Sequence, residues 1–324
     1  MIEQFRDKTR HAAELLSPVL HKTPLTWSAP LSEAIGGAVY LKQENLQRTH
    51  TCKARSAYYM LATLSEAERR HVVTVSTGNN GVSMSWAMSE LGIPGTVFLP
   101  HGVVPHKVAA IARHPITIIH EGDDIVDAEI VARAYAREHG YTFRSPYNEW
   151  GAMIAQATIA DEIFEQLDAV GATADAFVVP VGGGGLIAGI AAYLLDDGRK
   201  VELIGAQPEK SPVMALSVRA GRILQMPSAP TLSDATAGGV EQGAITFAYC
   251  RDHVSDYVLL SEDEIADAMV LLYRDHDIRV EGSGALSVAT LLKHRDRFRG
   301  KTVVLLACGA NVDDALLERL CDAR

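Results

Sequence analysis

Residues 177–194 read FVVPVGGGGLIAGIAAYL, and this stretch decides the fold class. An apolar run typical of a buried strand leads into four glycines, and an apolar run of helical length follows them. The glycines are Gly182, Gly183, Gly184 and Gly185. Glycine lets several backbone N–H groups approach one anion, and a helix N-terminus adds its dipole, so we interpret this turn as a phosphate-binding loop. It matches neither a Walker A loop nor the G-x-G-x-x-G of a nicotinamide site.

The alternation of strand and helix recurs along the whole chain. Runs dense in Val, Ile and Leu predict strands, and segments such as 80–92 and 152–167 have a helical pattern. Continuous apolar strands suit a sheet that helices cover on both faces. The pattern therefore predicts an α/β protein with mainly parallel, doubly wound sheets. The predicted strands are 72–76, 95–100, 116–120, 176–182, 201–207 and 301–309.

The composition excludes several classes of partner. The chain has 324 residues and a formal net charge of −10, which argues against binding to nucleic acid or to an anionic membrane surface. No apolar run approaches the ~20 residues that cross a bilayer, and the charged N-terminus is unlike a signal peptide. The cysteines have no C-x-x-C spacing, so we expect reduced thiols in a cytoplasmic protein.

Three further stretches carry polar groups beside predicted elements. LKQENLQRTHTCKARSA (41–57) places Lys53 in a polar loop before a helix, where it is either a surface charge or an amine that attacks a carbonyl. VVTVSTGNNGVSMSWA (72–87) places short polar residues at the carboxyl end of a strand, where open α/β sheets bind ligands. An ordinary turn with a helix cap is the alternative there. Cys308 ends the last predicted strand, and alone it indicates only packing.

Taken in order, these stretches resemble the serine/threonine dehydratase and serine racemase group of fold-type II pyridoxal-phosphate enzymes, which are tryptophan synthase beta-like. That family shows K-x-E-N-L-Q-x-T-G-S-F-K-x-R-G-A, then S-x-G-N-H, G-G-G-G-L/M and S/C-G-G/A-N. The resemblance runs from His21 to Asn311. It implies a large α/β domain formed by 1–45 and 146–324, a small α/β domain of 46–145 inserted in it, and a homodimer.

The resemblance also implies a role for each matching residue. Lys53 would bind pyridoxal 5'-phosphate covalently and then move the substrate Cα proton, and Thr77 would be a second catalytic residue. Asn79 would hydrogen-bond the ring hydroxyl of the cofactor, and Cys308 would face its pyridine nitrogen. The phosphate would be bound by Gly182, Gly183, Gly184, Gly185 and Leu186. The substrate carboxylate would be bound by Ser76, Thr77 and Asn80.

Some positions depart from the family pattern. Cys52 stands where the family has a phenylalanine near the cofactor, and Asn80 stands where a histidine is usual. Gln207 stands where many relatives have a glutamate that helps bind a divalent ion, so we expect no metal there. These departures leave the identity of the substrate open.

The thiol at position 308 bears on the reaction. A neutral thiol cannot hold a full positive charge at the ring nitrogen as a carboxylate would, so expulsion of a β-leaving group would compete well. We therefore expect an ammonia-lyase or dehydratase that converts a β-hydroxy amino acid into a 2-oxo acid and ammonia. Threonine, serine and a larger or acidic analogue are the expected substrates. The alternatives are a racemase or β-replacement enzyme on the same scaffold, and a non-catalytic pyridoxal-phosphate-binding protein.

Overall fold

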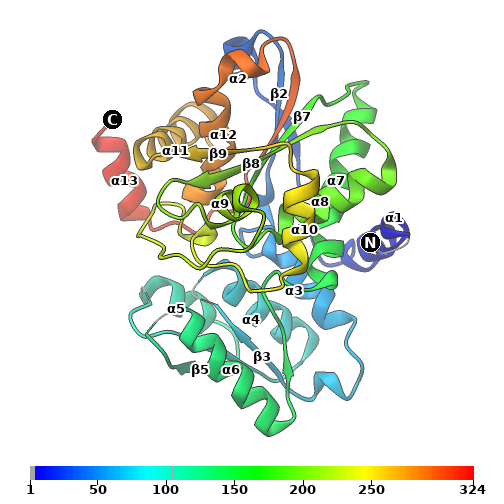
Figure 1. The fold of residues 1–324 in the computed structure, drawn as a ribbon, viewed down its shortest axis with the longest axis vertical. Coiled ribbons are helices and arrows are strands. Elements are labelled where there is room, and N and C mark those ends of the chain that lie inside the picture. Colours follow the sequence, from blue (N-terminus) through cyan, green and yellow to red (C-terminus); the bar gives the residue numbers. More distant parts are fainter. Residues whose placement is uncertain (1–3, 77, 104, 124) are drawn as a thin grey trace.

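The computed structural model describes residues 4–76, 78–103, 105–123 and 125–324. The chain forms two sheets, one of six strands in the order β1-β2-β10-β7-β8-β9 and one of four strands in the order β5-β4-β3-β6. Neighbouring strands are parallel except for β1 and β2, which are antiparallel. Figure 1 shows the four-stranded sheet and its helices below the six-stranded sheet. The predicted α/β class with mainly parallel sheets is confirmed.

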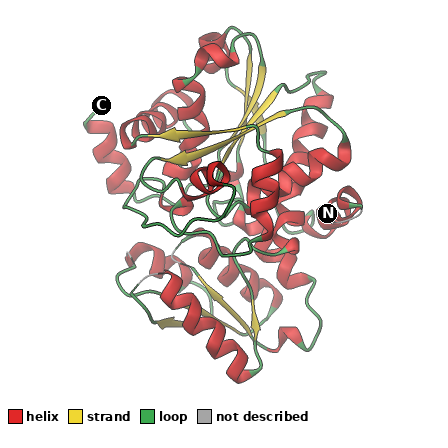
Figure 2. Ribbon diagram, in the orientation of Figure 1, coloured by secondary structure: helices red, strands yellow, loops and turns green. Residues whose placement is uncertain are grey.

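The six-stranded sheet is formed by segments from both ends of the chain. Its strands are β1 (Leu25–Trp27), β2 (Ala38–Lys42), β7 (Ala176–Pro180), β8 (Glu202–Pro208), β9 (Asp256–Leu260) and β10 (Thr302–Leu306). The helices in the same parts of the chain are α1 (Phe5–Leu16), α2 (Ala29–Ile35), α7 (Trp150–Ala169), α8 (Gly185–Asp197), α9 (Val213–Ala220), α10 (Ile245–His253), α11 (Glu262–His276), α12 (Gly282–Lys293) and α13 (Asp314–Asp322). Figure 2 shows helices on both faces of this sheet.

The four-stranded sheet is formed by consecutive segments of the chain. Its strands are β3 (Val72–Val75), β4 (Gly95–Leu99), β5 (Thr117–His120) and β6 (Thr142–Phe143). The helices of this part are α3 (Lys53–Ala62), α4 (Asn79–Leu91), α5 (Pro105–Ile111) and α6 (Ile125–His139). Short 3₁₀ turns occupy Glu44–Leu46, Glu68–Arg70, Asp234–Thr236 and Arg295–Phe298.

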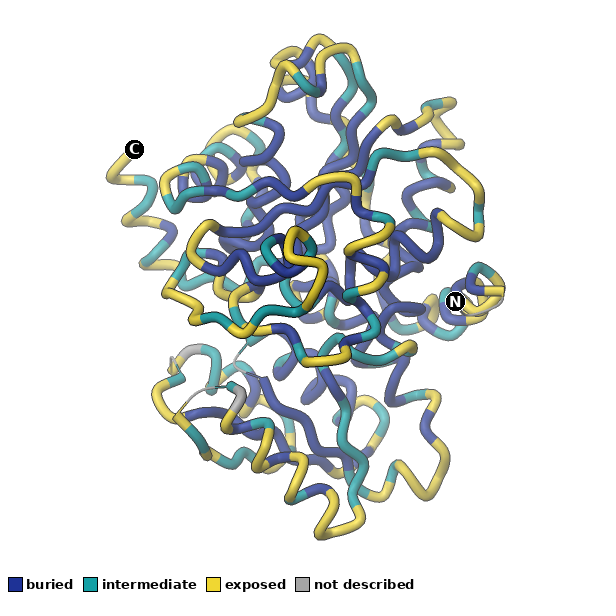
Figure 3. Tube along the Cα trace, viewed as in Figure 1, coloured by how far each residue is buried: buried dark blue, intermediate teal, exposed yellow. Residues whose placement is uncertain are grey.

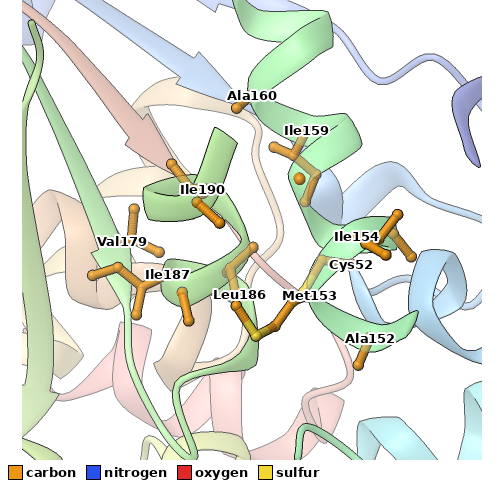
Figure 4. Packing of buried hydrophobic residues seen from close by; sticks show 14 of the residues in the cluster. Cys52, Ala152, Met153, Ile154, Ile159, Ala160, Val179, Leu186, Ile187 and Ile190 are labelled. Atoms are coloured by element: carbon orange, nitrogen blue, oxygen red, sulfur yellow. The ribbon is translucent and has the colours of Figure 1, made fainter. Parts of the chain in front are cut away.

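The core of the larger part has one layer on each face of its sheet. Along β7, Phe177 and Val179 pack into one cluster while Val178 packs into the other, because successive side chains of a strand point to opposite faces. Figure 4 shows Val179 close to Ile187 of α8, within the first cluster. Both sheets are buried along most of their length (Figure 3). Burial on both faces explains why these strands are apolar without alternation.

The predicted elements match the structure within a few residues. The six predicted strands correspond to β3, β4, β5, β7, β8 and β10, and the two predicted helices correspond to α4 and α7. The sequence analysis did not identify β1, β2, β6 and β9. Among the described residues, no helix is long and apolar enough to cross a membrane.

Candidate active site

A cavity of about 800 Å³ lies where the carboxyl ends of parallel strands from both sheets meet. This is the place where open α/β sheets bind ligands. Every described residue that the sequence analysis assigned to the site lines this cavity: Lys53, Ser76, Asn79, Asn80, Gly182, Gly183, Gly184, Gly185, Leu186 and Cys308. Thr77 lies outside the described residues. The structure thus gathers side chains and backbone from four separated stretches at one cavity.

Lys53 is the first residue of α3 and reaches into the cavity. Its Nζ lies 3.5 Å from the carbonyl oxygen of Pro146, a residue that also lines the cavity. Among the described residues Lys53 forms no salt bridge. Its amine is therefore available to a ligand in the cavity, as a residue that attacks a carbonyl must be.

A buried network of charges fixes the helix that carries Lys53. The guanidinium of Arg55 donates to both oxygens of Glu44, at 2.8 Å each, and to both oxygens of Glu162, at 2.6 and 2.9 Å. Glu162 also accepts a hydrogen bond of 2.6 Å from Lys42. Arg55, Glu44 and Lys42 are almost completely buried. Since bidentate pairs are geometrically specific, this network fixes α3 against β2 and α7.

The glycine loop has the shape of an anion cradle. A Cβ on Gly183 would lie 2.6 Å from the ring of Tyr147, and a Cβ on Gly184 would lie 2.9 Å from the Sγ of Cys250. Gly184 also has a φ of 88°, which glycine adopts without strain. It is the N-cap of α8 and supplies no side-chain cap, so the first N–H groups of α8 are free to bind a phosphate. These residues fit the phosphate of pyridoxal 5'-phosphate.

The amide of Asn79 is held in one orientation. Its Nδ2 donates a hydrogen bond of 2.5 Å to Glu281, and its Oδ1 accepts one of 2.7 Å from Asn311. This arrangement leaves one N–H of the amide for another acceptor. An N–H at the wall of the cavity fits the ring hydroxyl of pyridoxal 5'-phosphate.

Asn80 lines the same cavity with both polar atoms of its amide unpaired. The side chain is buried, and neither its nitrogen nor its oxygen has a hydrogen-bond partner among the described residues. Buried amides without partners are rare in native proteins. The amide of Asn80 therefore fits a polar ligand better than it fits the protein interior alone.

Glu281, which was not predicted from the sequence, holds a residue of the site from behind the cavity wall. Its Oε1 accepts hydrogen bonds from Asn79 at 2.5 Å and from Ser283 at 2.7 Å. Burial, together with the nearby Asp234, raises the pKa of Glu281 to about 7, against the hydrogen bonds from Ser283 and Asn79, which lower it. The available signal was a single acidic residue inside the otherwise apolar or small VEGSGALSV (280–288). Its partner Asn79 is far away in the sequence, so no local pattern could connect them.

Cys52 and Cys308 lie opposite each other at the cavity. The backbone N–H of Cys52 donates a hydrogen bond of 2.9 Å to the carbonyl of Cys308. Burial raises the pKa of the Cys308 thiol well above its usual range, so the group is neutral at physiological pH. The family resemblance implies that Cys308 faces the pyridine nitrogen of the cofactor. A neutral thiol fits that position.

Two ion pairs connect the two parts of the molecule across the cavity. Lys107 of α5 pairs with Asp234, and Arg133 of α6 pairs with Glu241 at 3.2 Å. Residues 234–242, which belong to the long loop before α10, all line the cavity. No residue of this loop was among those that the family resemblance assigned to the site.

The side-chain amide of Gln207 forms hydrogen bonds within the protein. Its Nε2 donates to the carbonyl of Val181, and its Oε1 accepts from the N–H of Ala215, at 3.0 and 2.7 Å. Within the described ranges, no three His, Cys, Asp or Glu residues are grouped as metal ligands would be. Gln207 therefore has a structural role in holding α9 against β7.

Comparison with known proteins gives the family. A family model described as "Pyridoxal-phosphate dependent enzyme" matches residues 16–309. The catabolic L-threonine dehydratase of Escherichia coli is 36% identical over 95% of this chain and 93% of that protein. The L-threo-3-hydroxyaspartate ammonia-lyase of Saccharomyces cerevisiae is 32% identical over 93% of this chain and 91% of that protein. The structure of maize serine racemase has a TM-score of 0.89 at 28% identity and covers 97% of this chain and 95% of that one.

The match with the family model extends over most of the chain and includes all the stretches that line the cavity. The free amine of Lys53, the uncapped glycine loop and the fixed amide of Asn79 suit the aldehyde, the phosphate and the ring of one cofactor. The chain belongs to the family of pyridoxal-phosphate-dependent enzymes.

Proposed function

We propose that the protein is an ammonia-lyase that acts on a β-hydroxy amino acid. The net reaction converts HO–CHR–CH(NH₃⁺)–COO⁻ into R–CH₂–CO–COO⁻ and NH₄⁺, with one water lost at the β-carbon and one regained on hydrolysis. The observation that carries the proposal is the neutral Cys308 thiol in the same cavity as Lys53. Relatives named for ammonia-lyase or dehydratase activity on threonine and on hydroxyaspartate support it.

The residues that line the cavity have distinct roles in the proposed reaction. Bound pyridoxal 5'-phosphate supplies the electron sink for the pair left at the substrate Cα. Lys53 holds the cofactor through its amine and, once released, removes the Cα proton as a base. The N–H groups of 182–186 hold the phosphate, and Asn79 donates to the ring oxygen. Ser76 and Asn80 orient the substrate by its carboxylate. By the family resemblance, Thr77 shares this role and is a second catalytic residue.

Cys308 is the residue of this chain that would favour elimination over racemisation when the cofactor is bound. Because its thiol is neutral, it cannot stabilise a protonated ring nitrogen by charge, and the electron pair at Cα is less stabilised. Loss of a leaving group from the β-carbon would then be favoured over return of the proton to Cα. General acid assistance to the departing hydroxyl is worth ~10²–10⁴-fold in such reactions.

The proposal includes the organisation of the molecule. Residues 46–145 form a small domain inserted in a large domain of 1–45 and 146–324; that the whole four-stranded sheet falls inside 46–145 supports these boundaries. We also propose a cytoplasmic homodimer, on the basis of the family resemblance. Light scattering coupled to size exclusion tests the dimer, and a single peak at 35 kDa would contradict it.

A substrate panel tests the activity. Purified enzyme with pyridoxal 5'-phosphate is incubated with L-threonine, L-serine and L-threo-3-hydroxyaspartate, and the 2-oxo acid and ammonia are measured. We expect equal amounts of both products from at least one substrate and none with Lys53→Ala. If no β-hydroxy amino acid releases a 2-oxo acid, the proposed function is wrong.

A racemase is the second candidate, because the structure of maize serine racemase is so similar. Chiral analysis of the remaining substrate in the same incubations separates the two activities. The ammonia-lyase proposal predicts that the remaining amino acid keeps its configuration while the oxo acid accumulates.

A further inference from the structure

The segment before α3 pairs with the segment after β10 in an antiparallel bridge. Thr51 lies opposite Gly309 in this bridge. The N–H of Cys52 donates to the carbonyl of Cys308 at 2.9 Å, and the N–H of Ala310 donates to the carbonyl of His50 at 2.8 Å. Counted outward from the isolated bridge, the register sets Cys52 against Cys308, although Cys52 already has the helical backbone of the N-cap of α3, with φ −56° and ψ −19°. The Cys52 thiol is also close enough to the Cys308 thiol to raise its pKa. Residues directly opposite in antiparallel pairs have Cα atoms ~4.5–5.5 Å apart, which is within the ~4.4–6.8 Å that a disulfide spans.

Both thiols also face the same space. Cys52 and Cys308 line the cavity, both are free, and their side chains are buried. Figure 4 shows Cys52 beside Met153, and both belong to the same apolar cluster. The other two cysteines differ: Cys250 is buried but does not line the cavity, and Cys321 lies on α13.

We propose that Cys52 and Cys308 form a reversible disulfide on oxidation, and that this disulfide prevents tight binding of the cofactor. The effect on the cofactor rests on the proposed function, which places the pyridine ring beside these two residues. Formation of the disulfide rests only on the register and on the shared cavity. In a disulfide the two Cβ atoms are ~3.8 Å apart, so the bridge would close the floor of the cavity and restrain the residue next to Lys53.

The oxidant is a hydroperoxide. The thiolate of one cysteine attacks the O–O bond, which breaks, and gives a sulfenic acid while the hydroperoxide is reduced to water or an alcohol. The second thiol then attacks the sulfenic sulfur, the S–S bond forms, and water leaves. Two thiols are oxidised and one hydroperoxide is reduced, so the electrons balance.

The surroundings of the thiols make this reaction slow in the filled site. Burial, with smaller contributions from the carboxylates of Glu44 and Glu281, raises the pKa of Cys52 to about 12, against a lowering by Lys53. Thiolate is the reacting form, and its fraction is small at neutral pH. The cofactor would in addition cover both sulfur atoms. We therefore expect oxidation to be fastest in the cofactor-free protein at mildly alkaline pH.

The test uses the full chain, with the cofactor removed or bound, exposed to hydrogen peroxide. Free thiols are then alkylated under denaturing conditions, and peptides are mapped without reduction. The matched variants are Cys52→Ser, Cys308→Ser and Cys250→Ser. We expect a cross-linked pair of peptides containing Cys52 and Cys308 in wild type and in Cys250→Ser, and none in the other two variants.

Binding is measured on the same samples. Titration with pyridoxal 5'-phosphate, followed by absorbance, should show a dissociation constant raised by roughly tenfold or more in the oxidised wild type. Dithiothreitol should restore it. Cys52→Ser should keep its affinity after peroxide treatment.

Three results would overturn the inference: no cross-link between these two cysteines in the folded cofactor-free protein, a cross-link that involves Cys250 instead, or unchanged affinity after complete cross-linking. The first two would leave the proposed function intact. Absence of 2-oxo acid production from unoxidised enzyme, together with the cross-link, would contradict the proposed function and leave the disulfide standing.

Discussion

Glu281 is a carboxyl group whose environment changes sharply between the folded and the unfolded chain. It is buried behind the cavity wall, where Asn79 and Ser283, which line the cavity, donate to one of its oxygens. Burial nevertheless raises its pKa from 4.5 to about 7. Because the folded state binds this proton more tightly than the unfolded state, Glu281 contributes stability that is complete below pH ~4.5. That contribution is lost as the pH rises to about 7.

Glu281→Gln tests this balance, because glutamine keeps the acceptor oxygen and cannot ionise. Relative to the variant, we expect the cofactor-free wild type to lose on the order of 3 kcal/mol of unfolding free energy between pH 4.5 and pH 8. Urea unfolding of both proteins across this range measures the difference. A difference that does not change with pH would contradict the account.

The role of the neutral thiol of Cys308 can be tested by replacing it with a carboxylic acid. Cys308→Asp would place a negative charge in the cavity beside the proposed position of the ring nitrogen and should stabilise a protonated ring. We expect less 2-oxo acid and more exchange of the substrate Cα proton with deuterium from the solvent, measured by NMR on the remaining substrate. Cys308→Ser is the matched neutral control and should keep elimination dominant. Equal exchange in both variants would argue against a role for charge at this position.

At the scale of elements, α3 depends on the charges behind it. Arg55 lies two residues after Lys53 and makes four hydrogen bonds with two carboxylates. Removing one partner of a buried ion pair leaves the other charged and unpaired, which costs ~3–5 kcal/mol. Arg55→Met should therefore destabilise the protein by about that amount.

The control for this variant is Arg299→Met, which breaks an exposed pair with Asp296. Exposed pairs contribute little, so its melting temperature should hardly change. Calorimetry of both variants decides the matter. Equal melting temperatures for the two would contradict the assigned role of the Arg55 network.

The elements also show what the sequence could predict. Strands such as β7 and β10 were found because they are buried on both faces and continuously apolar. The capping box of Ser261 and Glu264 at the start of α11 is an equally local signal, because its residues lie three apart in the sequence and cap the helix themselves. The strands β1 and β6 have three and two residues and carry no periodic signal.

Contacts between distant segments could not be predicted in this way. Asn79 and Glu281 are 202 residues apart, and Cys52 meets Cys308 only through the fold. The motifs predicted which stretches belong to the site, because each carries its own chemistry. The partners that hold those residues in place come from tertiary structure.

At the scale of the whole molecule, Glu241 joins the two parts around the cavity. Its carboxylate accepts hydrogen bonds of 2.9 Å from Ser145 and Asn148 and pairs with Arg133 at 3.2 Å. Glu241→Gln should weaken these contacts and favour an open cavity. We expect KM for the amino acid to rise by roughly 2- to 10-fold, with a smaller change in kcat. The effect is modest because a partly exposed ion pair contributes little free energy.

A matched variant for Glu241→Gln is Asp256→Asn, whose partner Arg297 lies outside the residues that line the cavity. Steady-state kinetics should show an unchanged KM for this control. If both variants alter KM equally, or if neither does, the ion pair across the cavity has no part in substrate binding.

Reductive trapping is the most direct measurement of the central claim. Enzyme loaded with pyridoxal 5'-phosphate is treated with borohydride, digested, and mapped by mass spectrometry. The account predicts one modified peptide, with the phosphopyridoxyl group on Lys53, and no such label in Lys53→Ala. A label on another lysine, or a Lys53→Ala variant that is labelled to the same extent, would contradict it.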